Sequence, residues 1–240
     1  MNITKTFPVA ALACVLAAIL STGCASTDVT SRNQLVTGAL PRPAVIWVYD
    51  FTADPAQVPA DSALAGPAAA PAAPPTAEQQ AVVRQLGDAI ATELVRDIQA
   101  MGMPAAEANS ASRPQVNDLV IRGYFVSIDE GNAAKRMTIG FGAGGSQLTT
   151  MVEGFQMTAS GLRKLGYGTV DAGGGKGPGA ALGAAGWAVT GNPVGLIVGG
   201  GVKVYGEASG SATIEGRGKA TAQEIASVLK TRFQEQCWIQ

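Results

Sequence analysis

The chain has 240 residues, with 17 basic and 18 acidic side chains and no histidine; glycine is abundant, at 31 residues, and aromatic residues make up 5%. That length suits one domain or two small ones, and the balance of charge argues against the concentrated basic face that binds nucleic acid. The absence of histidine removes the commonest general base, the commonest metal ligand and all Ser-His or Cys-His nucleophiles, so we expect no enzymatic activity, cofactor or metal.

Residues 1–23 have the layout of a secretory signal peptide. A basic residue precedes an apolar run over residues 9–20, which is too short to span the ~30 Å hydrocarbon core of a bilayer as a helix. The ending "LSTGC" resembles the lipobox of bacterial lipoproteins, in which the cysteine, here Cys24, becomes the lipidated first residue of the mature chain. It departs from that pattern at Ser21, where an aliphatic residue is usual. The alternative is an ordinary secreted protein cleaved near Ala25.

The same resemblance bears on localisation and on the other cysteines. Ala25 and Ser26 follow Cys24 where an Asp would favour the inner membrane, so the resemblance implies the outer membrane. Cys14 leaves with the signal peptide, and Cys237 is then a single thiol without an intrachain partner. We expect Cys237 to be a small buried apolar side chain.

The first part of the mature chain alternates polar and apolar segments. Residues 24–43 are polar and are expected to form a tether, after which an α+β domain covers residues 44–172. The β-branched and aromatic run at residues 45–51 predicts a strand buried on both faces. The Pro- and Ala-rich stretch at residues 52–76 has almost no large apolar side chain and predicts an extended loop.

An amphipathic helix is predicted after Thr76. Apolar residues recur there at spacings of three and four, and charged residues occupy the rest of the helical wheel. Thr76 and Gln79 have the spacing of a capping box. Gly102 and Pro104 end the helix.

Three strands and a second helix are predicted further along. The segment "NDLVIRGYFVSIDEG" predicts a strand with a bulge at Gly123. Residues 148–158 and 162–171 predict a hairpin joined by "ASG". Residues 220–235 predict a C-terminal amphipathic helix. The order of elements favours an α+β fold with a small mixed or antiparallel sheet.

Glycines four residues apart mark the uncharged region within residues 173–240. Spacing of four places small residues on one helix face, where two backbones can approach closely. Because Asn192 and Pro193 suit a turn between two helices, we predict a glycine-rich helical hairpin that leads into the C-terminal helix. The alternative is a glycine-rich loop. The predicted helix-packing residues are Gly175, Gly179, Gly183, Gly191, Gly195 and Gly199.

Two patterns that suggest chemistry have simpler interpretations. "GFGAGG" at residues 140–145 matches a dinucleotide-binding pattern, but a β-type run rather than a helix follows it, which favours a plain connection. The carboxylates of Asp50, Asp171 and the pair Asp129 and Glu130 do not converge in sequence, so surface solvation is the expected role for each.

Three blocks of sequence carry a family resemblance. "VIWVYDFTADPAQVP", "KRMTIGFGAGGSQL" and the segment that begins "TGNPVGLIVGGG" resemble the bacterial lipoprotein family known as domain of unknown function 4410, over residues 44–239. The resemblance implies an outer-membrane-associated lipoprotein and brings no activity. The glycine block also resembles the glycine-zipper lipoproteins of the cell envelope.

We therefore expect an outer-membrane protein, anchored by lipid on Cys24 and facing the periplasm, with a structural, assembly or docking role in the envelope. Its expected partners are the membrane and another copy of itself or an envelope protein, without nucleic acid. The alternative is a periplasmic module that binds a small ligand or assists transport. An enzyme hypothesis survives only as a hydrolase built on carboxylates or on a Ser/Lys pair.

Overall fold

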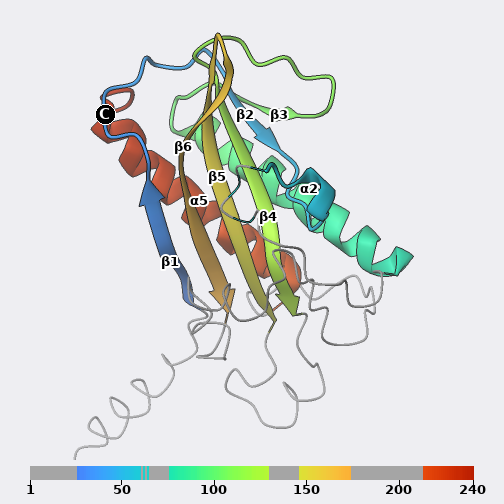
Figure 1. Cartoon of the computed structure of the whole chain (residues 1–240). Coiled ribbons are helices and arrows are strands. Elements are labelled where there is room, and N and C mark those ends of the chain that lie inside the picture. The colour runs from blue at the N-terminus through green and yellow to red at the C-terminus, as the bar shows by residue number, and fades with distance from the viewer. Residues whose placement is uncertain (1–25, 61, 63, 65–75, 130–145, 174–212) are drawn as a thin grey trace, which may run out of the picture.

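The computed structural model describes residues 26–60, 62, 64, 76–129, 146–173 and 213–240. Within these residues the chain forms a six-stranded mixed sheet with the strand order β1-β6-β5-β4-β2-β3, and two α-helices cover one face of it (Figure 1). This arrangement confirms the α+β prediction. The signal peptide, Cys24 and the expected glycine-rich hairpin fall outside the described residues, on residues 1–25 and 174–212.

The elements in chain order are β1 (Ser26–Gln34), β2 (Ile46–Tyr49), the short 3-10 helix η2 (Pro55–Gln57), α2 (Ala77–Ala100), β3 (Ala105–Ala108), β4 (Leu119–Asp129), β5 (Gln147–Thr158), β6 (Gly161–Gly173) and α5 (Ile214–Glu235). Strand β2 runs parallel to β3 and β4, whereas β4, β5, β6 and β1 pair antiparallel. The strand expected at residues 45–51 and the expected hairpin are thus confirmed as β2 and as β5–β6.

Strand β1 differs from the expected tether. It pairs with β6 from Ser26 opposite Gly173 to Gln34 opposite Gly166. A Cβ atom at Gly166 would lie 2.6 Å from the backbone oxygen of Asn33, so glycine is what lets the two strands approach there. The sequence of β1 is polar and did not predict a strand. A strand at the edge of a sheet can carry polar and charged side chains, so it has little apolar pattern.

Both helices begin at threonine caps. Thr76 and Gln79 form the expected capping box of α2, with Gln79 N donating to Thr76 Oγ1 at 3.2 Å. Helix α5 begins at Ile214, earlier than the expected residue 220, because Thr213 Oγ1 accepts from the backbone N–H of Gly216 at 3.1 Å. No helix in the described part of the chain has the length and apolarity to cross a bilayer.

The main core lies between the sheet and the two helices, and Phe51 is central to it. A Cβ at Gly87 of α2 would meet the carbonyl oxygen of Phe51 at 2.0 Å, and one at Gly123 of β4 would meet the Phe51 ring at 2.0 Å. Gly123 therefore makes room for an aromatic ring. The expected bulge at Gly123 is wrong, since the register of β4 shifts between Phe125 and Ser127.

The C-terminus also corrects an expectation. Cys237 is exposed, not buried, and its backbone is left-handed with φ of 56°. This turn after α5 directs Trp238 back against Phe233, with the ring centroids 5.6 Å apart. The large indole, rather than the small thiol, thus fills the end of the core.

Candidate functional site: a cavity between the sheet and α5

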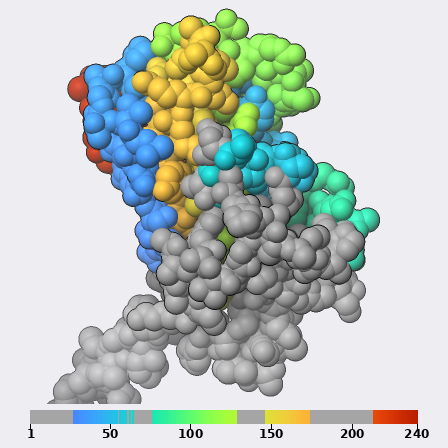
Figure 2. All heavy atoms as spheres, in the orientation of Figure 1, coloured from blue at the N-terminus to red at the C-terminus, as the bar shows by residue number. Residues whose placement is uncertain are grey.

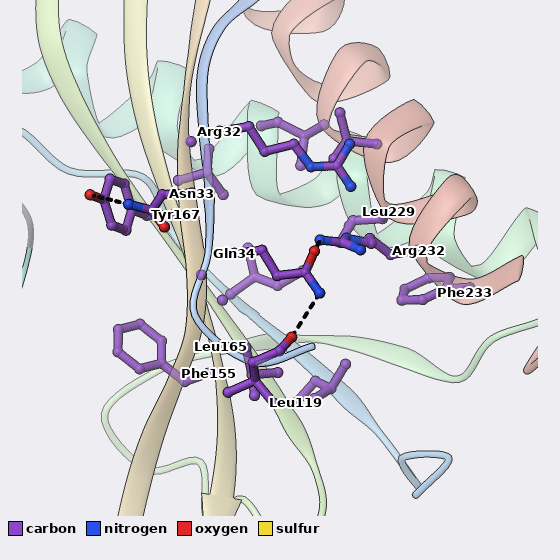
Figure 3. Close-up of a pocket in the computed structure, with 18 of the residues that line it drawn as sticks. Arg32, Asn33, Gln34, Leu119, Phe155, Leu165, Tyr167, Leu229, Arg232 and Phe233 are labelled. Atoms are coloured by element: carbon purple, nitrogen blue, oxygen red, sulfur yellow. Dashed lines mark hydrogen bonds between the residues drawn. The ribbon is translucent and has the colours of Figure 1, made fainter. Parts of the chain in front are cut away.

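A cavity of about 200 Å³ lies between the helix-covered face of the sheet and the C-terminal half of α5 (Figure 3). Strands β1, β4, β5 and β6 form its floor, and α5 forms its roof. The apolar side chains around it are Leu40, Leu119, Val152, Leu165, Val170, Ile225, Leu229, Phe233 and Trp238.

Glycines in the floor create the hollow. Val152 packs against the main core, and Gly154, two residues further along β5, shares that face of the sheet. Gly154 pairs with Gly166 of β6, and Val152 pairs with Gly168, so three glycines lie together. A Cβ atom at Gly154 would meet nothing within 4 Å. The floor therefore lacks the side chains that would otherwise reach α5.

Two arginines border the cavity. Arg32 of β1 is exposed and extends toward α5, where Arg232 lies beside Gln34 (Figure 3). The guanidinium of Arg232 donates to Gln34 Oε1 and pairs with the carboxylate of Glu235. None of the ion pairs among the described residues involves Arg32. The rim therefore carries two positive charges and one negative charge.

The chain that follows β1 closes one end of the cavity. The backbone N–H of Leu40 donates to Gln236 Oε1 at 2.7 Å, and Trp238 Nε1 donates to the Leu40 carbonyl at 3.3 Å. Gln236 Nε2 donates to the Gly38 carbonyl at 3.4 Å. These contacts fasten this segment to the end of α5, so floor and roof are held together at this end.

A polar cluster lies on the opposite face of the sheet. Glu153 is fully buried, and its Oε1 accepts from Lys164 Nζ at 2.9 Å and from Ser62 Oγ at 3.0 Å. Ser62 follows the described residues 52–60, and Leu64 and Val58 pack on this face among side chains of β4 and β5. Figure 2 shows residues 52–60, in cyan, lying over the strands.

This cluster contains the Ser/Lys pair that a hydrolase would need, but in a different arrangement. Both side chains donate to the same carboxylate oxygen, Oε1 of Glu153. In a catalytic pair the serine hydroxyl would instead donate its proton to the lysine. The geometry supports a structural role, in which Glu153 fastens Ser62 to the sheet.

One carboxyl group outside the cavity, that of Asp50, has a shifted pKa. Burial raises the pKa of Asp50 above its usual range, and the negative charges of Asp88 and Glu107 raise it further. Asp50 thus has acidic neighbours in space that its sequence position did not indicate. Among the described residues, no three potential ligands lie close enough to hold a metal ion.

None of the site residues expected from the sequence lies among the described residues. Cys24 and the six glycines, Gly175, Gly179, Gly183, Gly191, Gly195 and Gly199, lie outside the described residues, as does "GFGAGG" at 140–145. The residues that the cavity brings together were not expected. The sequence did contain one signal for them: the glycines within the predicted strands. Glycine inside a strand often marks a bulge or a close approach of another backbone.

Comparison with known proteins identifies the family. Residues 46–191, more than half of the chain, match the family described as Domain of unknown function (DUF4410), and the chain belongs to it. A search of curated proteins gave no match.

The chain is also similar to two crystal structures of the PelC dodecamer from Paraburkholderia phytofirmans, one of them a single-substitution variant. For the variant, sequence identity is 10% and the TM-score is 0.34; for the other, they are 12% and 0.33. Each alignment covers 65% of this chain and 91% of the PelC chain. A likeness this distant carries no information about function.

Proposed function

We propose that this protein is a non-enzymatic lipoprotein, anchored by lipid on Cys24 in the outer membrane and facing the periplasm, where it assembles with itself or with another envelope protein. The start of β1 is the observation that supports this most directly. Since β1 begins at Ser26, an anchor on Cys24 would hold the folded domain close to the membrane surface, without a long tether.

The position of β1 also suits a docking role. It is an edge strand, paired with β6 on one side, and an edge strand offers backbone groups to which another chain can add. Leu35, directly after β1, is 52% exposed. The helical hairpin predicted from the sequence around Gly175 to Gly199 would supply a second surface, since helices striped with glycine can pack closely.

One experiment, membrane fractionation followed by cross-linking, tests both parts of this proposal. Wild-type protein should incorporate a labelled fatty acid, sediment with outer membranes and form cross-linked oligomers or adducts. Cys24→Ala should lose label and membrane association. Cys237→Ala is the matched control, because that cysteine is exposed and lies far along the chain, and it should behave as wild type.

The assembly part has its own variant in the same experiment. Replacing both Gly195 and Gly199 by leucine should abolish the cross-linked species while leaving the lipid label in place. Val198→Leu, which adds bulk to the same segment without changing the glycine series, should not. Equal fractionation of wild type and Cys24→Ala would disprove the anchor. A wild-type protein that gives no oligomer and no adduct would disprove assembly.

The cavity favours a second role, the binding of a small ligand. Apolar pockets with a few polar groups at the rim are the usual form of small-molecule sites. This role is compatible with a lipid anchor and does not depend on it.

A further inference from the structure

We propose that the cavity under α5 binds a small amphiphile, which has an apolar chain or ring and a single anionic group such as a carboxylate. The apolar part lies over Gly154, and the anionic group meets Arg32 and Arg232 at the rim. This inference deepens the ligand-binding role proposed above and rests on it, but it is independent of the anchor and of assembly.

The size of the cavity sets the size of the ligand. At about 200 Å³ it is larger than the ~150 Å³ apolar cavity that is known to accept benzene. It is smaller than the roughly 300–1,000 Å³ of pockets for drug-sized molecules. A short acyl chain or one aromatic ring is therefore the appropriate apolar group.

The shape of the floor indicates that the hollow is built into the strands. Gly154 has an ordinary extended backbone that would allow a side chain, and a Cβ there would enter open space. At Gly168, by contrast, a Cβ would lie 2.9 Å from the carbonyl oxygen of Ser31. Glycine at 168 is thus required by the pairing of β1 with β6, whereas glycine at 154 serves only to leave space.

The charges at the rim determine the head group. Arg232 is shared between Glu235 and Gln34, and Arg32, which extends toward the same helix, pairs with none of the described carboxylates (Figure 3). A guanidinium binds a carboxylate or phosphate through parallel hydrogen bonds. An anion placed between these arginines would neutralise the excess positive charge of the rim.

Calorimetric titration with octanoate and with octanol tests the proposal, because the two probes share a tail and differ in charge. The full chain carrying Cys24→Ala is purified without detergent, which would otherwise compete for the cavity. Octanoate should bind, and octanol should bind at least tenfold more weakly. Arg32→Gln should weaken octanoate about tenfold, the equivalent of one charge-assisted contact, and leave octanol unchanged.

Variants that fill the cavity provide the second arm. Gly154→Leu should abolish octanoate binding, whereas Ala100→Leu should not, since Ala100 is exposed at the end of α2 and does not line the cavity. Arg84→Gln, at an exposed position on α2, is the control for charge. Should Gly154→Leu fail to fold, Leu229→Phe fills the cavity from the side of α5 and should have the same effect.

Several outcomes would overturn the proposal. The first is equal binding of octanoate and octanol, and the second is unchanged octanoate binding in the variant that fills the cavity. The third is no binding to the parent chain, as expected if a segment of the protein already fills the space. Each would leave the fractionation and cross-linking results unaffected. Failure of the ligand site is therefore distinguishable from failure of the anchor or of assembly.

Discussion

Asp118 is a buried carboxylate that accepts hydrogen bonds from two backbone N–H groups and from one indole side chain. Its two oxygens accept from Val45 N at 3.1 Å, Trp47 Nε1 at 2.9 Å and Gln115 N at 2.8 Å. Asp118 is 2% exposed, so its carboxylate oxygens depend on these protein donors for their hydrogen bonds. Asp118 thus fixes the loop before β4 to the start of β2, in the middle of the sheet.

Asp118→Ala should lower the free energy of unfolding by about 2–4 kcal/mol, because it removes three hydrogen bonds that a buried carboxylate makes between β2 and the loop before β4. Urea denaturation measures this loss. Asp54→Ala is the matched control: that exposed carboxylate accepts from Ala56 N at 2.9 Å, and its loss should cost no more than about 1 kcal/mol. Similar denaturation midpoints for the two variants would contradict the proposed role of Asp118.

Asp50 gives a prediction about pH. Because burial and then the charges of Asp88 and Glu107 raise its pKa in the folded state, the folded protein holds this proton more tightly than the unfolded chain does. Stability contributed by Asp50 is therefore present at low pH and is lost as pH rises from the usual Asp range through the raised pKa.

Asp50→Asn should accordingly raise Tm at pH 7, and the difference from wild type should disappear when Asp50 is protonated in both states. The effect should stay below about 0.5 kcal/mol, because the burial of Asp50 is only partial and solvent screens its neighbours. Thermal melts of both proteins between pH 3 and 7 measure it. A difference that grows as the pH falls would have the wrong sign.

At the scale of elements, the contact of Ser62 with the sheet depends on an ion pair between two strands. Glu153 and Lys164 lie on the neighbouring strands β5 and β6, and Ser62 Oγ donates to the Glu153 carboxylate. Both charged side chains are largely buried, with exposed fractions of 0% for Glu153 and 11% for Lys164. Removing one partner of such a pair costs more than replacing both.

Lys164→Met should therefore destabilise the protein by about 3 kcal/mol, and adding Glu153→Gln should restore most of that loss. Urea denaturation of the single and double variants measures the coupling. Arg96→Met removes the guanidinium that pairs with Glu93 on α2; this side chain is 63% exposed, so its loss should cost less than about 1 kcal/mol. If the effects of the two substitutions on the free energy of unfolding simply add, the two side chains do not couple.

The elements that the sequence predicted correctly are those with a strong local signal. Helix α2 has apolar periodicity and a capping box, and β5–β6 has two β-type runs joined by a short turn. Strands β1 and β3 were missed because their sequences, "STDVTSRNQ" and "AAEA", have little apolar pattern. Both lie at sheet edges, where pairing depends on a neighbouring strand far away in sequence.

At the scale of the whole molecule, the cavity could not be predicted because its walls come from distant parts of the chain. Arg32 on β1 and Arg232 on α5 border the same cavity only when the sheet and the helix have packed. The glycines of its floor are visible in the sequence, but Gly166 and Gly154 become neighbours only through the register of β5 with β6. The sequence of one strand shows only how its polar and apolar side chains alternate, which does not determine how it pairs with its neighbour.

The pairing of β1 with β6 has a consequence for the order of folding. Among the described strands, β1 is synthesised first and its partner β6 last, with Ser26 opposite Gly173. Closing so long a loop is slower than forming the local hairpin β5–β6. A nascent chain must keep β1 unpaired until β6 exists, and a chain that stops before Thr213 has the floor of the cavity without its roof. The cavity can therefore bind its ligand only after synthesis of the chain is almost complete.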